Sequence, residues 1–152
     1  MQPTAPCEPG AFGTVTSRRP IGEREYRTMV IIYEQAGGLL DENEAVCLLR
    51  RHVEQPIGKL ARWLVERRIV FFRWKFRTFI PVFQFERREM TLRKSLAPVL
   101  AELTDVFDDW AVALWFAQPN SWLDGSAPAA VLADKPEGVQ QAARADRFIA
   151  CG

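Results

Sequence analysis

The stretch that most constrains the fold is IVFFRWKFRTFIPVFQF, residues 69–85. Aromatic and β-branched side chains dominate it, and such residues favour strands over helices. The best break lies at Lys75–Arg77, so we expect a β-hairpin of about residues 69–74 and 78–85. No Asn-Gly or Asp-Gly marks the turn, and Pro81 limits the second strand to an edge position or a bulge. One hairpin therefore interrupts a chain whose other segments have helical patterns.

The segments before the hairpin have the apolar periodicity of amphipathic helices. Residues 23–37 repeat apolar side chains at i, i+3, i+4 and i+7 and end on a glycine pair. Asp41 precedes Glu44 by three residues, a capping-box pattern at the start of a second helix. Pro56 suits the first turn of a third, basic helix. Helix, turn, basic helix and hairpin together match the outline of a winged helix-turn-helix.

The segments after the hairpin also predict helices, each with its own boundary signal. Asp108 or Asp109 caps one helix, Pro119 ends it, and Ser126 caps a short helix that follows. A final helix opens at Pro136.

These patterns predict a mainly α fold of the α+β kind. It has an N-terminal winged helix-turn-helix-like half with one β-hairpin, and then a small C-terminal helical bundle. Residues 1–20 hold four prolines, so we expect a flexible tail there. The helix-turn-helix-like region then spans residues 21–85, and the C-terminal helical domain spans residues 86–152.

The net charge of +1 hides an asymmetry between the two halves. Residues 18–94 hold 17 Lys and Arg against 10 Asp and Glu, whereas residues 95–152 hold 3 against 8. A basic half and an acidic half indicate two surfaces with different partners, although charges also simply solvate the faces of an ordinary domain. No apolar run reaches the roughly 18 residues of a membrane span. The three scattered cysteines, Cys7, Cys47 and Cys151, predict no disulfide framework, which favours a reducing cytoplasm.

The chain offers little catalytic chemistry. His52 is the only histidine, so a hydrolase with a histidine base would have to use it. Its expected place in the last turn of a helix, where the helix dipole favours a cation, is the simpler reading. Asp108 and Asp109 read as helix-capping carboxylates rather than a catalytic pair. The cysteines lack metal-ligand spacing, and no glycine-rich phosphate loop occurs. We therefore expect no enzyme, no metal and no cofactor.

The basic segment between the third helix and the hairpin is a candidate DNA contact. Basic side chains dominate it, with Glu66 as the one acid, and this density suits attraction to a polyanion. The alternative is that these charges keep an aromatic-rich hairpin soluble. The candidate DNA-binding residues are Lys59, Arg62, Arg67, Arg68, Arg73, Lys75 and Arg77.

The segment from PVFQFE to WFAQPNSWLDGSAPAAVL, within residues 78–150, resembles the toxin-binding C-terminal domain of Xre/MbcA/ParS-type antitoxins. That family has a P-x-F-Q-F element, a helix with tryptophan, then P-N-x-x-L-x-G-x-x-P and a final helix. The residues that carry the resemblance are Pro81, Phe83, Gln84, Phe85, Trp110, Trp115, Pro119, Asn120, Leu123, Gly125 and Pro128.

The resemblance implies an antitoxin-like interaction protein that binds and neutralises a RES-domain toxin, an enzyme that degrades NAD. Family antitoxins often repress their own operon and are commonly homodimers, so operator DNA and a second copy are further expected partners. The alternative is a DNA-binding transcriptional regulator without a toxin partner. Because the family's last helix and tail help to close the toxin's site, the resemblance implies toxin contacts at Arg144, Arg147 and Phe148.

The loop PNSWLDG holds two large apolar side chains among turn residues. Leu123 matches a fixed position of the family pattern, and we expect it to pin the loop to the core. Trp122 occupies a variable position, so we expect it at the surface as a toxin contact.

Overall fold

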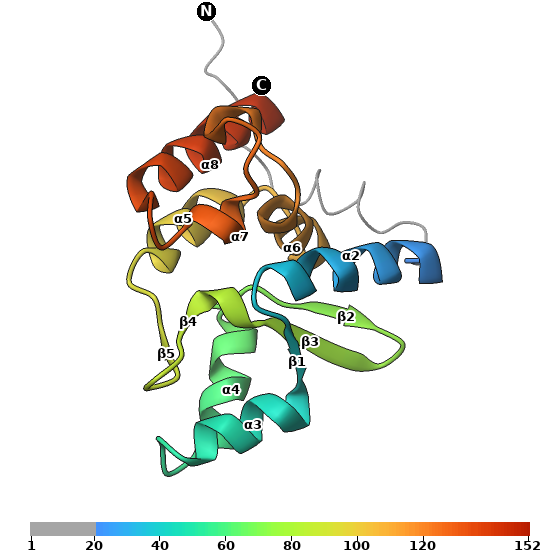
Figure 1. The fold of residues 1–152 in the computed structure, drawn as a ribbon, viewed down its shortest axis with the longest axis vertical. Coiled ribbons are helices and arrows are strands. Elements are labelled where there is room, and N and C mark those ends of the chain that lie inside the picture. Colours follow the sequence, from blue (N-terminus) through green and yellow to red (C-terminus); the bar gives the residue numbers. More distant parts are fainter. Residues whose placement is uncertain (1–20) are drawn as a thin grey trace, which may run out of the picture.

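The computed structural model describes residues 21–152. The predicted tail of residues 1–20 lies outside this range. The described chain is mainly helical with a small antiparallel sheet, so the predicted fold class is confirmed at this level. Figure 1 shows the order of the elements. They are α2 (Glu23–Gln35), β1 (Leu39–Asp41), α3 (Glu42–Arg50), α4 (Pro56–Val65), β2 (Phe72–Trp74), β3 (Arg77–Pro81), the 3-10 turn Val82–Gln84, β4 (Phe85–Glu86), β5 (Thr91–Leu92), α5 (Leu96–Leu103), α6 (Asp109–Ala117), the 3-10 turn Ser121–Leu123, α7 (Pro128–Val131) and α8 (Pro136–Cys151).

The main sheet has the strand order β1-β3-β2, and both pairings are antiparallel. The predicted hairpin is confirmed as β2 and β3, which pair Phe72 with Phe79. Both strands are shorter than predicted: β2 begins only at Phe72, and β3 ends at Pro81 because the chain then turns into a 3-10 helix. Pro81 ends the central strand, so the predicted edge or bulge position is wrong. The three-residue strand β1 was not predicted, because it is too short for an alternating pattern.

The buried amide of Gln84 explains why the chain turns there. Its Oε1 accepts from the backbone N–H of Val70 at 2.7 Å, and its Nε2 donates to the Val70 carbonyl at 2.9 Å. Nε2 also donates to the Pro81 carbonyl at 2.9 Å. The side chain thus pairs with the Val70 backbone as a neighbouring strand would, and satisfies polar groups that would be costly to bury unpaired.

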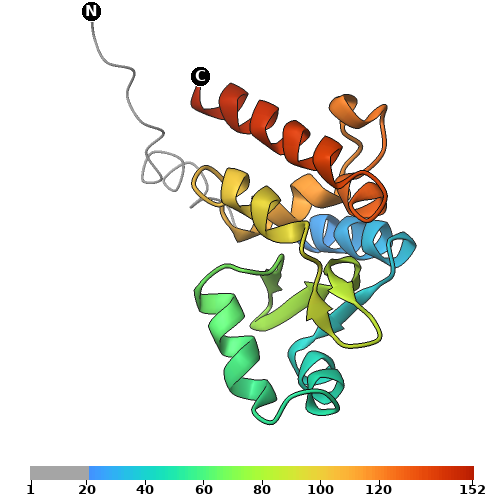
Figure 2. The same ribbon diagram turned by 90° about the vertical axis from the view of Figure 1, so that its left-hand side faces the viewer.

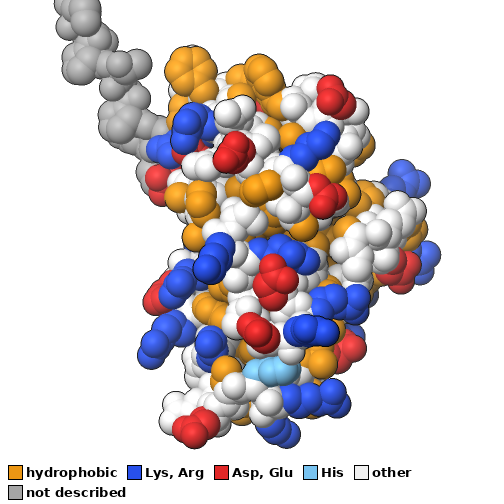
Figure 3. Space-filling model, turned by 60° about the vertical axis from the view of Figure 1, so that its left-hand side comes forward, with side chains coloured by type: hydrophobic (Ala, Val, Ile, Leu, Met, Phe, Trp, Pro, Cys, Tyr) orange, Lys and Arg blue, Asp and Glu red, His pale blue; other side chains and the backbone are white. Residues whose placement is uncertain are grey.

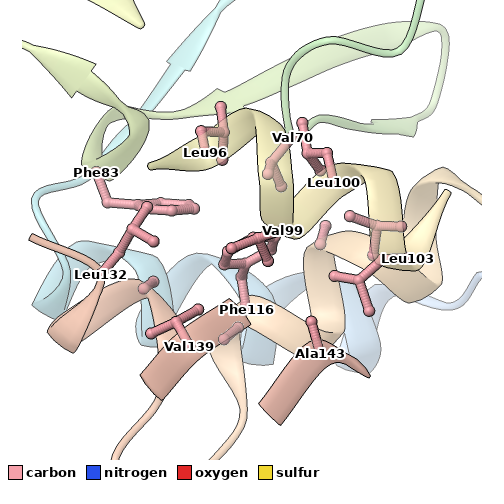
Figure 4. Close-up of a cluster of buried hydrophobic side chains, with 14 of the residues drawn as sticks. Val70, Phe83, Leu96, Val99, Leu100, Leu103, Phe116, Leu132, Val139 and Ala143 are labelled. Atoms are coloured by element: carbon pink, nitrogen blue, oxygen red, sulfur yellow. The ribbon is translucent and has the colours of Figure 1, made fainter. Parts of the chain in front are cut away.

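Two hydrophobic clusters lie on opposite faces of the sheet. Figures 1 and 2 show α2 and α5–α8 on one side of the sheet and α3 and α4 on the other. We call the first the helical cluster, because α2 and α5–α8 supply most of it; Figure 4 shows its centre. It consists of Met29, Tyr33, Val70, Phe72, Phe79, Phe83, Leu96, Val99, Leu100, Leu103, Val112, Ala113, Phe116, Ala117, Leu123, Ala129, Leu132, Val139, Ala142 and Ala143. We call the second the α3–α4 cluster. It consists of Ala45, Leu49, Leu60, Trp63, Ile69, Phe71, Ile80, Phe85 and Met90.

The boundary between the two clusters follows the sheet. It does not fall at residue 85, where the helix-turn-helix-like region was predicted to end. Alternate residues of a strand point to opposite faces, so Phe72 and Phe79 enter the helical cluster while Phe71 and Ile80 enter the other. Helix α2 belongs with the C-terminal helices. The buried Tyr33 hydroxyl donates to the Ala113 carbonyl at 2.6 Å, and burial raises the pKa of Tyr33 well above its usual range.

Among residues 21–152, the thiol of Cys47 is exposed and free.

Candidate nucleic-acid interface and partner-binding loop

Helix α3 begins at the predicted capping box. The Asp41 carboxylate accepts from the Glu44 backbone N–H at 2.9 Å, and the Glu44 carboxylate accepts from the Asp41 backbone N–H at 3.1 Å. The Glu44 N–H, with help from Arg77, lowers the pKa of Asp41 below its usual range. His52 lies in the turn just after α3, not in its last helical turn as predicted.

Helix α4 begins at Pro56, as predicted, and buries one face against the α3–α4 cluster. Leu60 and Trp63 point into that cluster. The opposite face exposes the basic side chains of Lys59 and Arg62. It also exposes two large apolar side chains, since Ile57 is 67% and Val65 83% exposed. This mixed face leaves α4 able to contact both charged and apolar groups.

Most predicted DNA-binding residues remain unpaired at the surface. No carboxylate among the described residues forms an ion pair with Lys59, Arg62, Arg68, Arg73 or Lys75.

Aromatic rings hold three of these cations in place. Lys59 Nζ lies 5.4 Å from the ring centre of Trp63, and Lys75 Nζ lies 4.5 Å from that of Trp74. The Arg73 guanidinium lies 5.3 Å from the Phe71 ring. A cation over a ring face is attracted by the ring quadrupole.

A surface hollow of about 650 Å³ brings three of the predicted residues together. Lys59 and Arg62 of α4 line it with Arg68 from the segment after α4, and Glu54 is the one acidic residue of the lining. Figure 3 shows one side of the molecule. In its lower part, which contains α3 and α4 in Figure 1, Lys and Arg side chains outnumber acidic ones.

Arg67 and Arg77 have carboxylate partners. The Arg67 guanidinium forms an ion pair with Asp109 at 2.9 Å and donates to the carbonyls of Thr104 and Phe107, both at 2.7 Å. This arginine joins the end of α4 to the α5–α6 connection, so its role is structural and it is not part of the candidate interface. Arg77 forms an ion pair with Asp41 at 2.7 Å, but its side chain stays 60% exposed.

The two carboxylates at the start of α6 have structural partners. Asp108 caps the helix, as predicted, by accepting from the Ala111 backbone N–H at 2.8 Å. Asp109 pairs with Arg67. Both contacts fit the interpretation of these residues as helix-start groups.

The loop PNSWLDG is organised around Asn120, which is 8% exposed. Its side-chain oxygen accepts from the Trp122 backbone N–H at 2.9 Å, and its backbone carbonyl accepts from Leu123 and Gly125. Asp124 and Gly125 then turn the chain with φ of 57° and 84°. Leu123 is 6% exposed in the helical cluster, so its predicted packing role is confirmed.

Asp146 of α8 gathers three family-motif and loop residues that sequence reasoning did not connect. Its carboxylate accepts from Trp115 Nε1 at 2.7 Å, from Asn120 Nδ2 at 3.0 Å and from Trp122 Nε1 at 3.2 Å. We call these four residues the Asp146 cluster. Asp146 was missed because it lies in a polar stretch of the last helix, and no motif position marks it.

Trp122 and Phe148 are exposed, as a partner contact requires, at 59% and 79%. Ile149, beside Phe148, is 66% exposed. Arg144 and Arg147 both reach Glu102 of α5, at 3.2 and 3.6 Å, and Arg147 also reaches Asp105 at 3.6 Å. The four predicted toxin contacts thus divide into two exposed aromatics and two arginines that hold α8 to α5.

Most of the remaining family-motif residues pack in the core. Phe83 enters the helical cluster and Phe85 the α3–α4 cluster, so the element P-x-F-Q-F joins both cores. Trp110 packs edge-on against Phe72, with ring centres 5.3 Å apart. Pro128 begins α7 and is buried, whereas Pro119 is exposed just after α6. Helix α7 is capped at Ala127 rather than at the predicted Ser126.

No family model, curated protein or solved structure matches the chain. Among residues 21–152, no helix has the length and apolar character to cross a bilayer.

Proposed function

We propose that this protein is an antitoxin-like DNA-binding regulator with two separate binding surfaces. Its α3–α4 pair and β2–β3 hairpin contact double-stranded DNA, and its PNSWLDG loop with the end of α8 contacts a RES-domain toxin. The DNA contact is the part that the geometry supports best. The single observation that carries it is a set of cations on the exposed face of α4 and on the β2–β3 hairpin that have no carboxylate partner among residues 21–152.

The order of the elements supports the DNA-binding part. From α2 to β3 the chain runs helix, strand, helix, helix, strand, strand, and the strands pair in the order β1-β3-β2. A winged helix-turn-helix has the same outline, with its second helix of the pair in the major groove. In this proposal α4 is the groove helix and the β2–β3 turn is the wing.

The exposed side chains divide between two kinds of contact. Lys59, Arg62, Arg68 and Arg73 are placed for phosphates, which carry most of the affinity and make it salt-dependent. Ile57 and Val65 on the same helix offer apolar contact to thymine methyl groups, which only the major groove displays.

Fluorescence anisotropy with a labelled mixed-sequence duplex tests the DNA contact. Binding should weaken steeply with salt, and Arg62→Glu should lower the affinity about tenfold and the salt slope by about 1. Lys135→Glu is the matched control, because it makes the same charge change at an exposed site in the acidic half. Absence of binding by the wild type at about 50 mM salt would refute the proposal.

The toxin contact is supported by a different observation. The Asp146 cluster holds Trp122 with its ring exposed, and Phe148 and Ile149 expose further apolar surface on α8. Exposed aromatic side chains on a rigid support are common anchors of protein interfaces. The alternative, a regulator without a toxin partner, makes this surface available for another protein or for a second copy of the chain.

Co-expression with the RES-domain protein encoded nearest to this gene tests the toxin contact. The wild type should co-purify with the toxin and prevent loss of cellular NAD, and Trp122→Ala with Phe148→Ala should abolish both effects. Ile31→Ala is the control, since Ile31 is 57% exposed on α2. If the wild type neither binds nor protects while DNA binding persists, the regulator alternative stands. Light scattering of the purified chain checks the expected homodimer.

A further inference from the structure

The turn that joins β2 to β3 is made of two residues that are poorly suited to it. Trp74 pairs with Arg77, so Lys75 and Phe76 alone form the loop. Both have left-handed backbones, with φ of 48° and 63°. A two-residue hairpin loop of this kind strongly prefers Asn-Gly or Asp-Gly, because a bulky L side chain is disfavoured at positive φ.

Phe76 offers the fold nothing in return for this strain. Its side chain is fully exposed, with a relative accessibility of 106%. No ring contact of Phe76 occurs among residues 21–152. Bulky residues held in sparsely populated backbone regions concentrate at functional sites. An exposed phenylalanine at a strained tip therefore indicates selection for something that the tip contacts.

The arm that carries Phe76 is firmly anchored. The Trp74 ring stacks on Tyr26 of α2, with ring centres 3.8 Å apart and planes 5° apart. On the other strand, Arg77 forms an ion pair with Asp41 at 2.7 Å, and the Thr78 N–H donates to Glu42 at 3.0 Å. The hairpin strands are therefore fixed by contacts with α2 and α3, and the exposed Phe76 side chain lies at their tip.

Charge on either side of Phe76 identifies what it contacts. Lys75 and Arg77 flank it directly, and Arg73 lies on the same hairpin. An apolar side chain flanked by basic residues is complementary to a ligand that has an anionic exterior and an interior of stacked, apolar groups. Duplex DNA has this character, because its phosphates lie outside and its base pairs stack within. Proteins that bend DNA insert such apolar side chains between base pairs from the minor groove.

We propose that Phe76 is a wedge that inserts between two base pairs and bends the bound DNA. The inference rests on the proposed DNA contact and adds a distinct step to it. Lys75 neutralises a phosphate beside the opened step, while Arg77 keeps its ion pair with Asp41. Flexible steps such as TA open most easily, so Phe76 favours sites with such a step at the wing.

The experiment uses the full chain and a duplex with a central TA step, the adenine of which is replaced by 2-aminopurine. Donor and acceptor dyes at the two ends report bending, and 2-aminopurine emission rises when the base unstacks. The variants are Phe76→Gly, Phe76→Leu and the control Ile31→Ala. Glycine adopts positive φ without strain, so Phe76→Gly should fold with an unchanged or raised melting temperature.

The wild type should bend the duplex and raise the 2-aminopurine emission. Phe76→Gly should lose both signals and bind about tenfold more weakly, the size expected for loss of one aromatic–base stack. Its salt slope should not change, because no cation is removed. Phe76→Leu, which keeps an apolar wedge, should retain the bend.

If Phe76→Gly binds and bends DNA as the wild type does, the wedge is wrong while the DNA contact stands. If the wild type does not bind the duplex at all, the DNA contact itself fails. If Phe76→Gly keeps the bend but no longer co-purifies with the RES-domain partner, the tip contacts protein and the wedge is again wrong.

Discussion

The two sides of the sheet differ in how much core they have and in what they leave exposed. The helical cluster is the larger, and the surface above it is acidic, with salt bridges and the Asp146 cluster joining its helices. The α3–α4 cluster is small, and the surface above it carries several cations without carboxylate partners among residues 21–152, in addition to the paired Arg77. The helical cluster thus supplies most of the hydrophobic core, and the side of the smaller α3–α4 cluster exposes the basic side chains.

This difference does not make the two sides independent. Neighbouring residues of β3, Phe79 and Ile80, supply opposite clusters. Arg67 also joins the end of α4 to the α5–α6 connection. We therefore expect one cooperative unfolding unit with two chemically distinct surfaces.

The largest expected effect on stability comes from removing a large side chain from the helical cluster. Phe116 has no exposed surface in the helical cluster, so Phe116→Ala should lower the free energy of unfolding by about 3–5 kcal/mol. Urea titration followed by hydrogen exchange measures the effect on each side. If α3 and α4 keep their protection while the C-terminal helices lose theirs, the two sides unfold separately and the cooperative account is wrong.

Removing the acceptor of the Asp146 cluster should have the next largest effect. Asp146→Ala leaves three donors without their acceptor, two of which are partly buried, so unfolding should become about 1–3 kcal/mol easier. Circular dichroism during thermal unfolding measures the loss. Toxin co-purification should fall and DNA affinity should stay unchanged. A fall in DNA affinity in the folded variant would show that the surfaces are not separate.

Arg67→Lys sharpens the distinction between structural and DNA-facing cations. Lysine keeps the charge but cannot reproduce the three directed hydrogen bonds of the guanidinium, so we expect a loss of about 1–2 kcal/mol in unfolding free energy. Anisotropy should show the same DNA affinity as the wild type. An affinity loss without a stability loss would place Arg67 in the interface after all.

The smallest expected effect concerns acid stability of the α3–α4 side. The folded-state pKa of Asp41 is lowered, mainly by the Glu44 N–H, so the carboxylate stabilises the fold above the unfolded pKa of about 3.8. That contribution is lost as pH falls through the lower, folded value. Asp41→Asn does not titrate, so its stability difference from the wild type should shrink below about pH 4. Urea midpoints across this range test it, and a constant difference would contradict the assignment.

Local chemistry made much of the fold predictable. The spacing of Asp41 and Glu44 and the place of Pro56 fix helix starts through contacts within one turn, and each prediction is confirmed. The hairpin followed from its aromatic and β-branched composition. In each case the deciding interactions lie within a few residues, so a single sequence contains them.

The remaining features depend on contacts between distant segments. Asp146 lies 24 residues or more from each of its donors. Arg67 was grouped with the DNA-facing cations because its sequence neighbours are basic, whereas its partners lie in a connection far along the chain. The extent of β3 was overestimated, because the Gln84 amide bonds to Val70 instead of continuing the ladder. Sequence pattern alone specified none of these pairs.

Hydrogen exchange with and without saturating duplex DNA tests the central claim of two separate surfaces most directly. DNA should slow exchange in α4 and in the β2–β3 hairpin and leave α6, the PNSWLDG loop and α8 unchanged. Slowed exchange confined to the C-terminal helices would contradict the account, because the acidic side would then be the one that meets DNA.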